Sequence, residues 1–132
     1  MMLKMHVESE VLHVSATGQF SMEEAKRTFI EVIDAVAKHR VDKVFFDGRG
    51  IEGNPELIER FYFSKFAAHT VNDYSSRGLC RFPIFGFVLK EPVLDPGRFG
   101  ETVAMNRGMH IKVFDNVKEA QVWLGIDPGK TT

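Results

Sequence analysis

Residues 44–56 read VFFDGRGIEGNPE. The stretch opens with an apolar run, continues through Asp47 and three glycines, and ends at Asn54-Pro55-Glu56. An apolar run without alternation is typical of a strand covered on both faces, whereas Asn followed by Pro is typical of a helix start. The segment between them has three interpretations: a phosphate-binding loop, a phosphorylation switch, or a turn that joins a buried strand to a helix.

The segments downstream of this stretch predict a parallel sheet. A helix is expected from about residue 55 to residue 74, with Asn54 as its N-cap, and a second buried strand at residues 84–89. Buried strands separated by helices indicate right-handed βαβ crossovers. Asp95 and Pro96 then predict a helix that ends near Gly108, followed by a strand at residues 110–114 and a last helix from Asn116 to Gly125.

The segments upstream predict a hairpin and one more helix. Residues 3–8 and 11–17 alternate between apolar and polar side chains, as half-buried strands do. A tight turn at Ser9-Glu10 would place three apolar pairs on one face and His6 opposite His13 on the other: Val7 with Leu12, Met5 with Val14 and Leu3 with Ala16. The pattern Ser21-Met-Glu-Glu24 is a capping box that opens an amphipathic helix.

These elements predict a single α/β domain. Its expected order is β-β-α-β-α-β-α-β-α, with a mixed, mostly parallel sheet and an antiparallel N-terminal hairpin. A chain of 132 residues fits one hydrophobic core. We expect the domain to span residues 1–126, followed by a short polar tail at residues 127–132.

The last third of the chain, RFGETVAMNRGMHIKVFDNVKEAQVWL at residues 98–124, resembles a known family. It is similar to the end of the STAS domains, in particular the SpoIIAA-like branch, whose fold is that of bacterial anti-sigma-factor antagonists. The shared features are Arg107-Gly108, Val113-Phe114, Asp115-Asn116, Glu119-Ala120 and Trp123-Leu124. The resemblance covers about residues 3–125. It implies a non-enzymatic role in protein interaction or regulation.

The resemblance also bears on the opening stretch. In antagonists that act as phospho-switches, a serine begins the helix after the central strand. Residues 53–57 contain no serine or threonine, and the nearest hydroxyl along the expected helix is Ser64. The chain therefore lacks the usual phosphoacceptor. Glu56 is interpreted as an ordinary acid at a helix start, with imitation of a phosphorylated side chain as the alternative.

The three glycines do not form a known phosphate-binding motif. Gly48, Gly50 and Gly53 match neither GxxxxGK[ST] nor GxGxxG. We interpret them as sources of positive φ in a tight loop. Anion binding at the helix start, assisted by Arg49, stays open.

Composition and charge limit the other functions. The formal net charge of −1 gives no electrostatic reason to expect nucleic acid. A lone Cys80 and the lack of a signal core or a long apolar run favour a cytoplasmic protein without a membrane span. No cofactor or metal is expected, because His6 and His13 alone offer too few ligands for stable zinc. With no recognisable nucleophile and base, an enzyme is the third hypothesis.

Two surfaces are candidates for binding. One lies at the carboxyl ends of the parallel strands, where α/β folds commonly place sites; its residues are Asp47, Arg49, Asn54, Glu56, Lys90 and Glu91. The other is the helix after Asn54, which is apolar all round. Its aromatic residues Tyr62, Phe63 and Phe66 predict a homodimer interface, unless residues 75–82 cover them.

The aromatic helix also raises an alternative function, a small-molecule or lipid carrier, because the related CRAL-TRIO lipid-binding domains have a similar architecture. An enclosed apolar cavity beside Phe63 and Phe66 would favour the carrier, whereas a flat apolar patch would favour the interaction module. A convergent polar cluster at Asp47, Arg49 and Lys90 would indicate an enzyme.

Overall fold

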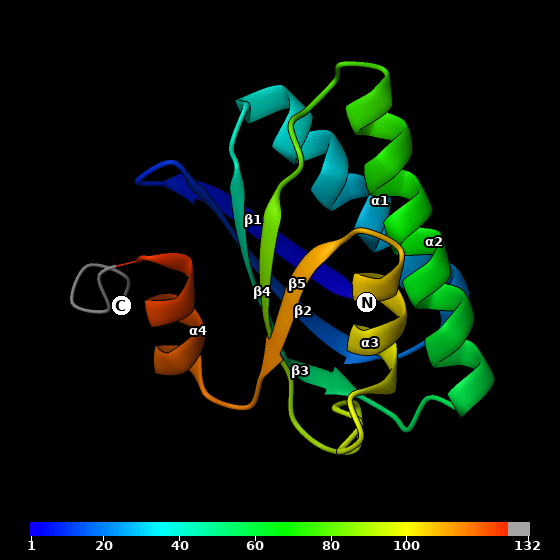
Figure 1. Ribbon diagram of the computed structural model, residues 1–132. Coiled ribbons are helices and arrows are strands. Elements are labelled where there is room, and N and C mark those ends of the chain that lie inside the picture. Colours follow the sequence, from blue (N-terminus) through cyan, green and yellow to red (C-terminus); the bar gives the residue numbers. More distant parts are fainter. Residues whose placement is uncertain (127–132) are drawn as a thin grey trace.

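The computed structural model describes residues 1–126 and contains one five-stranded sheet with four helices (Figure 1). The strand order across the sheet is β1-β2-β3-β4-β5. β1 is antiparallel to β2, and the other neighbours are parallel. The elements are β1 (Met2–Glu8), β2 (Val11–Gln19), α1 (Met22–His39), β3 (Lys43–Glu52), α2 (Leu57–Ser76), β4 (Ile84–Val88), α3 (Phe99–Asn106), β5 (His110–Phe114) and α4 (Val117–Leu124).

This order and the mixed sheet confirm the predicted fold class. The predicted polar tail, residues 127–132, lies outside the described residues. Within residues 1–126, no helix is both long enough and apolar enough to cross a membrane.

The N-terminal hairpin has the predicted register. Val7 pairs with Leu12, and His6 pairs with His13. Ser9 and Glu10 form the two-residue turn, with φ of 52° and 64°. Positive φ at both central residues matches the right-handed twist of the flanking strands, so the chain turns tightly even without glycine or asparagine there.

The helices divide between the two faces of the sheet. Helices α1, α2 and α3 lie on one face, and α4 lies on the other (Figure 1). The side chains of β3 alternate between the two resulting cores: Val44 and Phe46 face the three helices, whereas Phe45 packs with Ala120 and Leu124 of α4. Covering on both faces explains why this strand is apolar without alternation.

β3 is longer than predicted and includes two of the three glycines. Gly48 and Gly50 belong to the strand, and Gly53 alone of the three has positive φ, at 122°. A Cβ on Gly48 would lie 2.7 Å from Leu89 Cδ2, and one on Gly50 would lie 2.6 Å from Thr17 Cγ2. The interpretation of all three glycines as loop residues was therefore wrong, since Gly50 permits close approach of β2 and Gly48 leaves room for the Leu89 side chain.

Two of the predicted helix starts are also corrected. Asn54 is not the N-cap of α2; that position is Glu56, whose backbone N–H donates to Glu59 Oε1 at 2.8 Å. α3 begins at Phe99, after a turn in which Asp95 Oδ2 accepts a hydrogen bond from the Phe99 N–H. The predicted caps at Ser21 and Asn116 are confirmed, because each side chain accepts from a backbone N–H of its helix.

Candidate functional site

The predicted strand-end surface contains an ion pair on a β-bulge. Ser15 pairs with Asp47 and Thr17 pairs with Gly50, so β3 carries an extra residue between them. Such a bulge redirects the side chain that it carries. Here Arg49 turns back onto Asp47, with Nε–Oδ1 and Nη2–Oδ2 distances of 2.9 and 2.8 Å.

This pairing determines the charge state of Asp47. Burial alone would raise the pKa of the Asp47 carboxyl, but the hydrogen bonds and the charge of Arg49 outweigh it and lower that pKa. The carboxylate is therefore ionised and already occupied by Arg49 near neutral pH. Such a carboxylate is poorly suited to act as a general base.

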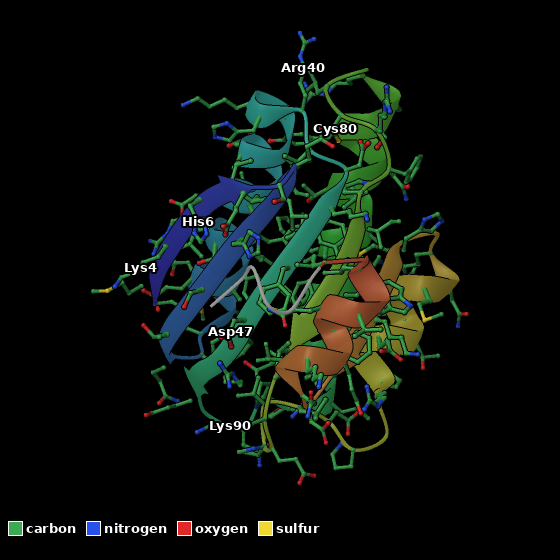
Figure 2. All side chains as sticks on the ribbon, turned by 90° about the vertical axis from the view of Figure 1, so that its left-hand side faces the viewer. Lys4, His6, Arg40, Asp47, Cys80 and Lys90 are labelled. Atoms are coloured by element: carbon green, nitrogen blue, oxygen red, sulfur yellow. The ribbon has the colours of Figure 1, made fainter. Side chains whose placement is uncertain are left out.

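The other strand-end candidates are exposed and do not converge on that pair. Asn54 and Glu56 lie in the loop before α2, and Lys90 and Glu91 lie in the loop after β4. Figure 2 shows Lys90 beyond Asp47 at the same end of the sheet. Within residues 1–126, no hydrogen bond or ion pair joins Lys90 or Glu91 to Asp47 or Arg49. The cluster of Asp47, Arg49 and Lys90 that would indicate an enzyme is therefore not formed in this structure.

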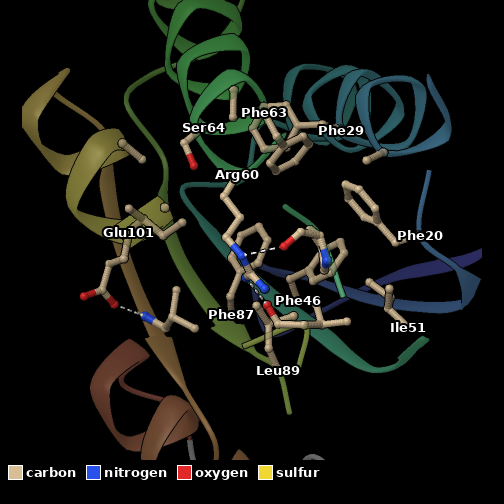
Figure 3. A pocket seen from close by; sticks show the side chains of 18 of the residues that line it. Phe20, Phe29, Phe46, Ile51, Arg60, Phe63, Ser64, Phe87, Leu89 and Glu101 are labelled. Atoms are coloured by element: carbon tan, nitrogen blue, oxygen red, sulfur yellow. Dashed lines mark hydrogen bonds between the residues drawn. The ribbon is translucent and has the colours of Figure 1, made fainter. Parts of the chain in front are cut away.

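An apolar cavity of about 150 Å³ lies between the sheet and helices α1, α2 and α3. In Figure 3, Phe29 and Phe63 come from the helices and Phe46 and Phe87 from the sheet, with Phe20 and Ile51 to one side. Phe29 meets Phe63 edge to face, with ring centroids 6.0 Å apart, and Phe46 stacks on Phe87 at 4.5 Å. Large rings therefore line the space without filling it.

Arg60 ties the loop after β4 to the start of α2 at one side of this cavity. Its guanidinium donates to the carbonyl oxygens of Val93, Pro92 and Pro55 at 2.6, 2.8 and 3.1 Å (Figure 3). Val93 and Leu89 of the same loop line the cavity. Arg60 was not predicted as a site residue; in the sequence, only its position one turn after Glu56 indicates a role near the helix start.

Glu101 of α3 and Arg98, the N-cap of α3, hold the edge strand β5 beside the cavity. Glu101, which lines the cavity, accepts a hydrogen bond from the Val113 N–H, and Arg98 donates to the Val113 carbonyl oxygen. These side chains satisfy backbone groups of β5 that have no strand neighbour on that side. The wall beside β5 is thus fixed by hydrogen bonds.

The aromatic residues of α2 face different directions. Phe63 faces the cavity and packs on the core, Phe66 lies under the ammonium group of Lys26 from α1, and Tyr62 is exposed. Helix α1 therefore covers part of both rings, through Phe29 on Phe63 and Lys26 on Phe66. Any self-association through α2 would rest on Tyr62 and exposed neighbours such as Ile58, and not on Phe63.

The fold resembles solved structures. One is the crystal structure of an anti-sigma factor antagonist from Mycobacterium paratuberculosis, with a TM-score of 0.60 and 17% identity over 94% of this chain and 93% of that chain. Another is the NMR structure of the protein TM1081, with a TM-score of 0.54 and 15% identity over 96% of this chain and 91% of that one. No family model matches the chain. No curated protein matches it significantly.

These likenesses show that the domain has the STAS/SpoIIAA-like fold, in agreement with the resemblance seen in its last third. At identities of 15–17% they establish the fold alone.

Proposed function

We propose that this protein is a non-enzymatic regulatory module of STAS-like fold that binds a small apolar ligand between the sheet and helices α1–α3. The observation that carries the proposal is the apolar cavity beside α2, which supports a ligand carrier over a flat interaction surface. Phe63 lines this cavity, whereas Phe66 does not. Protein interiors are normally packed without such spaces. A space of this size removes packing contacts from the rings around it, and a ligand that fills it restores them.

The cavity volume limits the size of the ligand. A dry apolar cavity of about 150 Å³ holds a molecule of roughly the size of benzene. Sites for drug-sized ligands usually enclose about 300–1,000 Å³. The proposed ligand is therefore a small aromatic or short aliphatic compound, or the end of a longer chain that reaches the surface, and not a fully enclosed lipid.

Thermal unfolding with benzene, indole and hexanoic acid as probes tests this proposal. A probe at ten times its Kd stabilises the native state by about 1.4 kcal/mol, which raises Tm by about 4 °C for a domain of this size. Native mass spectrometry of protein purified from its source cells would show whether a ligand is retained.

Two neighbouring alanines of α2 provide a matched pair of variants. Both are buried, but Ala67 lines the cavity and Ala68 does not. Ala67→Leu should fill the space, leave stability unchanged or slightly higher, and abolish the probe-induced shift. Ala68→Leu should cost about 1–3 kcal/mol by overpacking and retain the shift. Equal destabilisation by both variants, together with no response to any probe, would refute the proposal.

The second candidate function is recognition of a protein partner at the strand-end surface. It is supported by the exposed loops of Asn54, Glu56, Lys90 and Glu91 at one end of the sheet, and by the likeness to an anti-sigma factor antagonist. We expect this interaction to occur in the cytoplasm and without the usual phosphorylation switch. Residues 47–60 contain no serine or threonine, and Ser64 is buried beside Gly100.

Phosphate mapping and affinity capture test this second candidate. After incubation with ATP and extract of its source cells, peptide mapping should find no phosphate on Ser64. Immobilised wild-type protein should retain a partner that the double variant Lys90→Ala/Glu91→Ala loses, while Lys118→Ala/Glu119→Ala on α4 retains it. Stoichiometric phosphate on Ser64 that alters this capture would contradict the proposed mode of regulation.

A further inference from the structure

Three potential metal ligands meet on the N-terminal hairpin. His6 and Glu8 are alternate residues of β1, so their side chains share one face of the strand, and His13 of β2 is the direct cross-strand partner of His6. This face is the one that carries α4, which packs on β3, β4 and β5 (Figure 2). His6 lies on this face at the β1 edge of the sheet, away from α4 and on the same side of the sheet as Asp47.

The three side chains are close enough to share one ion. One ligand atom from each of His6, Glu8 and His13 lies within 4.8 Å of the other two. The separation of His6 Nε2 and Glu8 Oε2 is 3.7 Å. Two ligands of a tetrahedral zinc ion lie roughly 3.4 Å apart, given metal–ligand bonds of about 2.1 Å. Shifts of about 1 Å would therefore bring the ligands to bonding distance.

Two of the three side chains can move into position to bind an ion. The imidazole rings of His6 and His13 stack with centroids 4.9 Å apart and planes inclined by 8°, so a metal-bound pair requires one ring to turn. His6 and Glu8 are exposed and can rotate, whereas His13 is held by burial and by its contact with Phe45. His6 and Glu8 can therefore adjust their positions around an ion that is bound to the fixed His13.

An unpartnered atom gives independent support. His13 is only 9% exposed, and its Nε2 is buried without a hydrogen-bond partner among the described residues. A buried polar atom without a partner costs roughly 1–3 kcal/mol. A metal ion bound to that nitrogen would remove this cost. The sequence offered only His6 and His13, too few ligands for stable zinc, and Glu8 becomes the third ligand through the strand register.

We propose that His6, Glu8 and His13 form a binding site for a divalent transition metal of the zinc class. Two imidazoles and one carboxylate suit zinc, nickel or copper(II) and are a poor match for calcium or magnesium, which prefer oxygen ligands. Three protein ligands leave a coordination position for water or for a donor from another molecule. Because the ligands come from both strands, the ion would also clamp edge strand β1 to the sheet.

Metal titration of the untagged protein tests the site. Isothermal titration with Zn²⁺ should show one ion per chain, and Co²⁺ should give the visible absorption of a tetrahedral complex with nitrogen and oxygen ligands. His6→Ala and Glu8→Gln, both at exposed positions, should each weaken Zn²⁺ binding at least tenfold. His69→Ala removes an exposed histidine of α2 and should leave the affinity unchanged.

Amide NMR distinguishes this site from scattered surface binding. One equivalent of Zn²⁺ should shift the amide signals of residues 5–14 in the wild type and leave them unshifted in His6→Ala. Zn²⁺ should also raise Tm in the wild type and in His69→Ala only. Stoichiometric binding that survives in His6→Ala and Glu8→Gln, or wild-type affinity no tighter than that of the double variant His6→Ala/Glu8→Gln, would overturn the proposal.

Discussion

Arg60 Nη1 donates a 2.6 Å hydrogen bond to the carbonyl oxygen of Val93, and so joins the first turn of α2 to the loop that closes one side of the cavity. Two more carbonyls, those of Pro55 and Pro92, accept from the same guanidinium. Hydrogen bonds from a charged donor are stronger than neutral ones. Through the carbonyls of Val93 and Pro92, this one side chain anchors the loop to α2.

Arg60→Met should loosen this loop while keeping the apolar stem of the side chain. The expected loss of stability is about 2 kcal/mol, because three carbonyls lose their charged donor, and amide exchange of residues 89–98 should accelerate. Urea unfolding and hydrogen exchange measure the two effects. Arg27→Met is the control, since its exposed ion pair with Glu24 should contribute less than about 1 kcal/mol. Equal effects of the two substitutions would contradict this role of Arg60.

Gly50→Ala should destabilise the protein by about 1–3 kcal/mol, because the new methyl group would overlap Thr17 on the adjacent strand. Thr17→Ser removes the methyl group that lies 2.6 Å from the added Cβ and should restore part of the loss in the double variant. Gly97→Ala is the control, since its Cβ would meet nothing closer than 3.8 Å. Urea unfolding of all four variants tests the contact. Strictly additive effects of Gly50→Ala and Thr17→Ser would show that it is absent.

Asp47→Asn should lower stability at neutral pH and lose its effect in acid. The pKa of Asp47 is lowered in the folded protein, so the ion pair with Arg49 stabilises the fold above the unfolded-state pKa of about 3.9. That contribution is lost as the pH falls through the lowered folded-state pKa. Because Arg49 is half exposed, we expect less than about 1 kcal/mol at pH 7.

Urea unfolding at pH 7 and at successive steps below pH 4 measures this dependence. Arg49→Gln should show the same loss at neutral pH and the same convergence with the wild type in acid. A difference between wild type and Asp47→Asn that stays constant across this range would exclude the ion pair as its cause.

Tyr62→Glu should dissociate a homodimer formed through α2. Tyr62, Ile58 and Leu57 are at least 50% exposed on this helix, and a large exposed apolar surface favours association. Sedimentation at micromolar concentrations should show a dimer for the wild type and a monomer for Tyr62→Glu. Val122→Glu, at an exposed position on α4, should leave the dimer intact. A monomeric wild type would refute self-association.

Local sequence pattern was sufficient to predict the element order and the hairpin register. Strand side chains alternate with a period of two, so a shift by one residue would move Met5 and Val14 to the opposite face. Caps at Ser21 and Asn116 could also be read from the sequence, because a capping side chain bonds the backbone of its own helix. The motifs of the last third led to the right fold for a similar reason: they mark helix and strand ends.

The role of the opening stretch was decided by tertiary contacts. The length of β3 and the need for Gly48 and Gly50 depend on Leu89 and Thr17, which belong to other segments. Asn54 had the better capping side chain, yet Glu56 became the N-cap of α2. Nothing within VFFDGRGIEGNPE contains those neighbours, so the stretch alone could not separate a loop glycine from a close-packed strand glycine.

The sequence by itself determined the order of strands and helices and which faces of them are apolar, because these follow from periodicity along the chain. The tertiary structure alone decided that Phe63 lines a cavity and Tyr62 lies outside, that Arg60 holds the loop after β4, and that Glu8 joins the two histidines. Each of these depends on how segments distant in sequence pack around a shared volume. Residual space and converging ligands are properties of that packing, and no single segment encodes them.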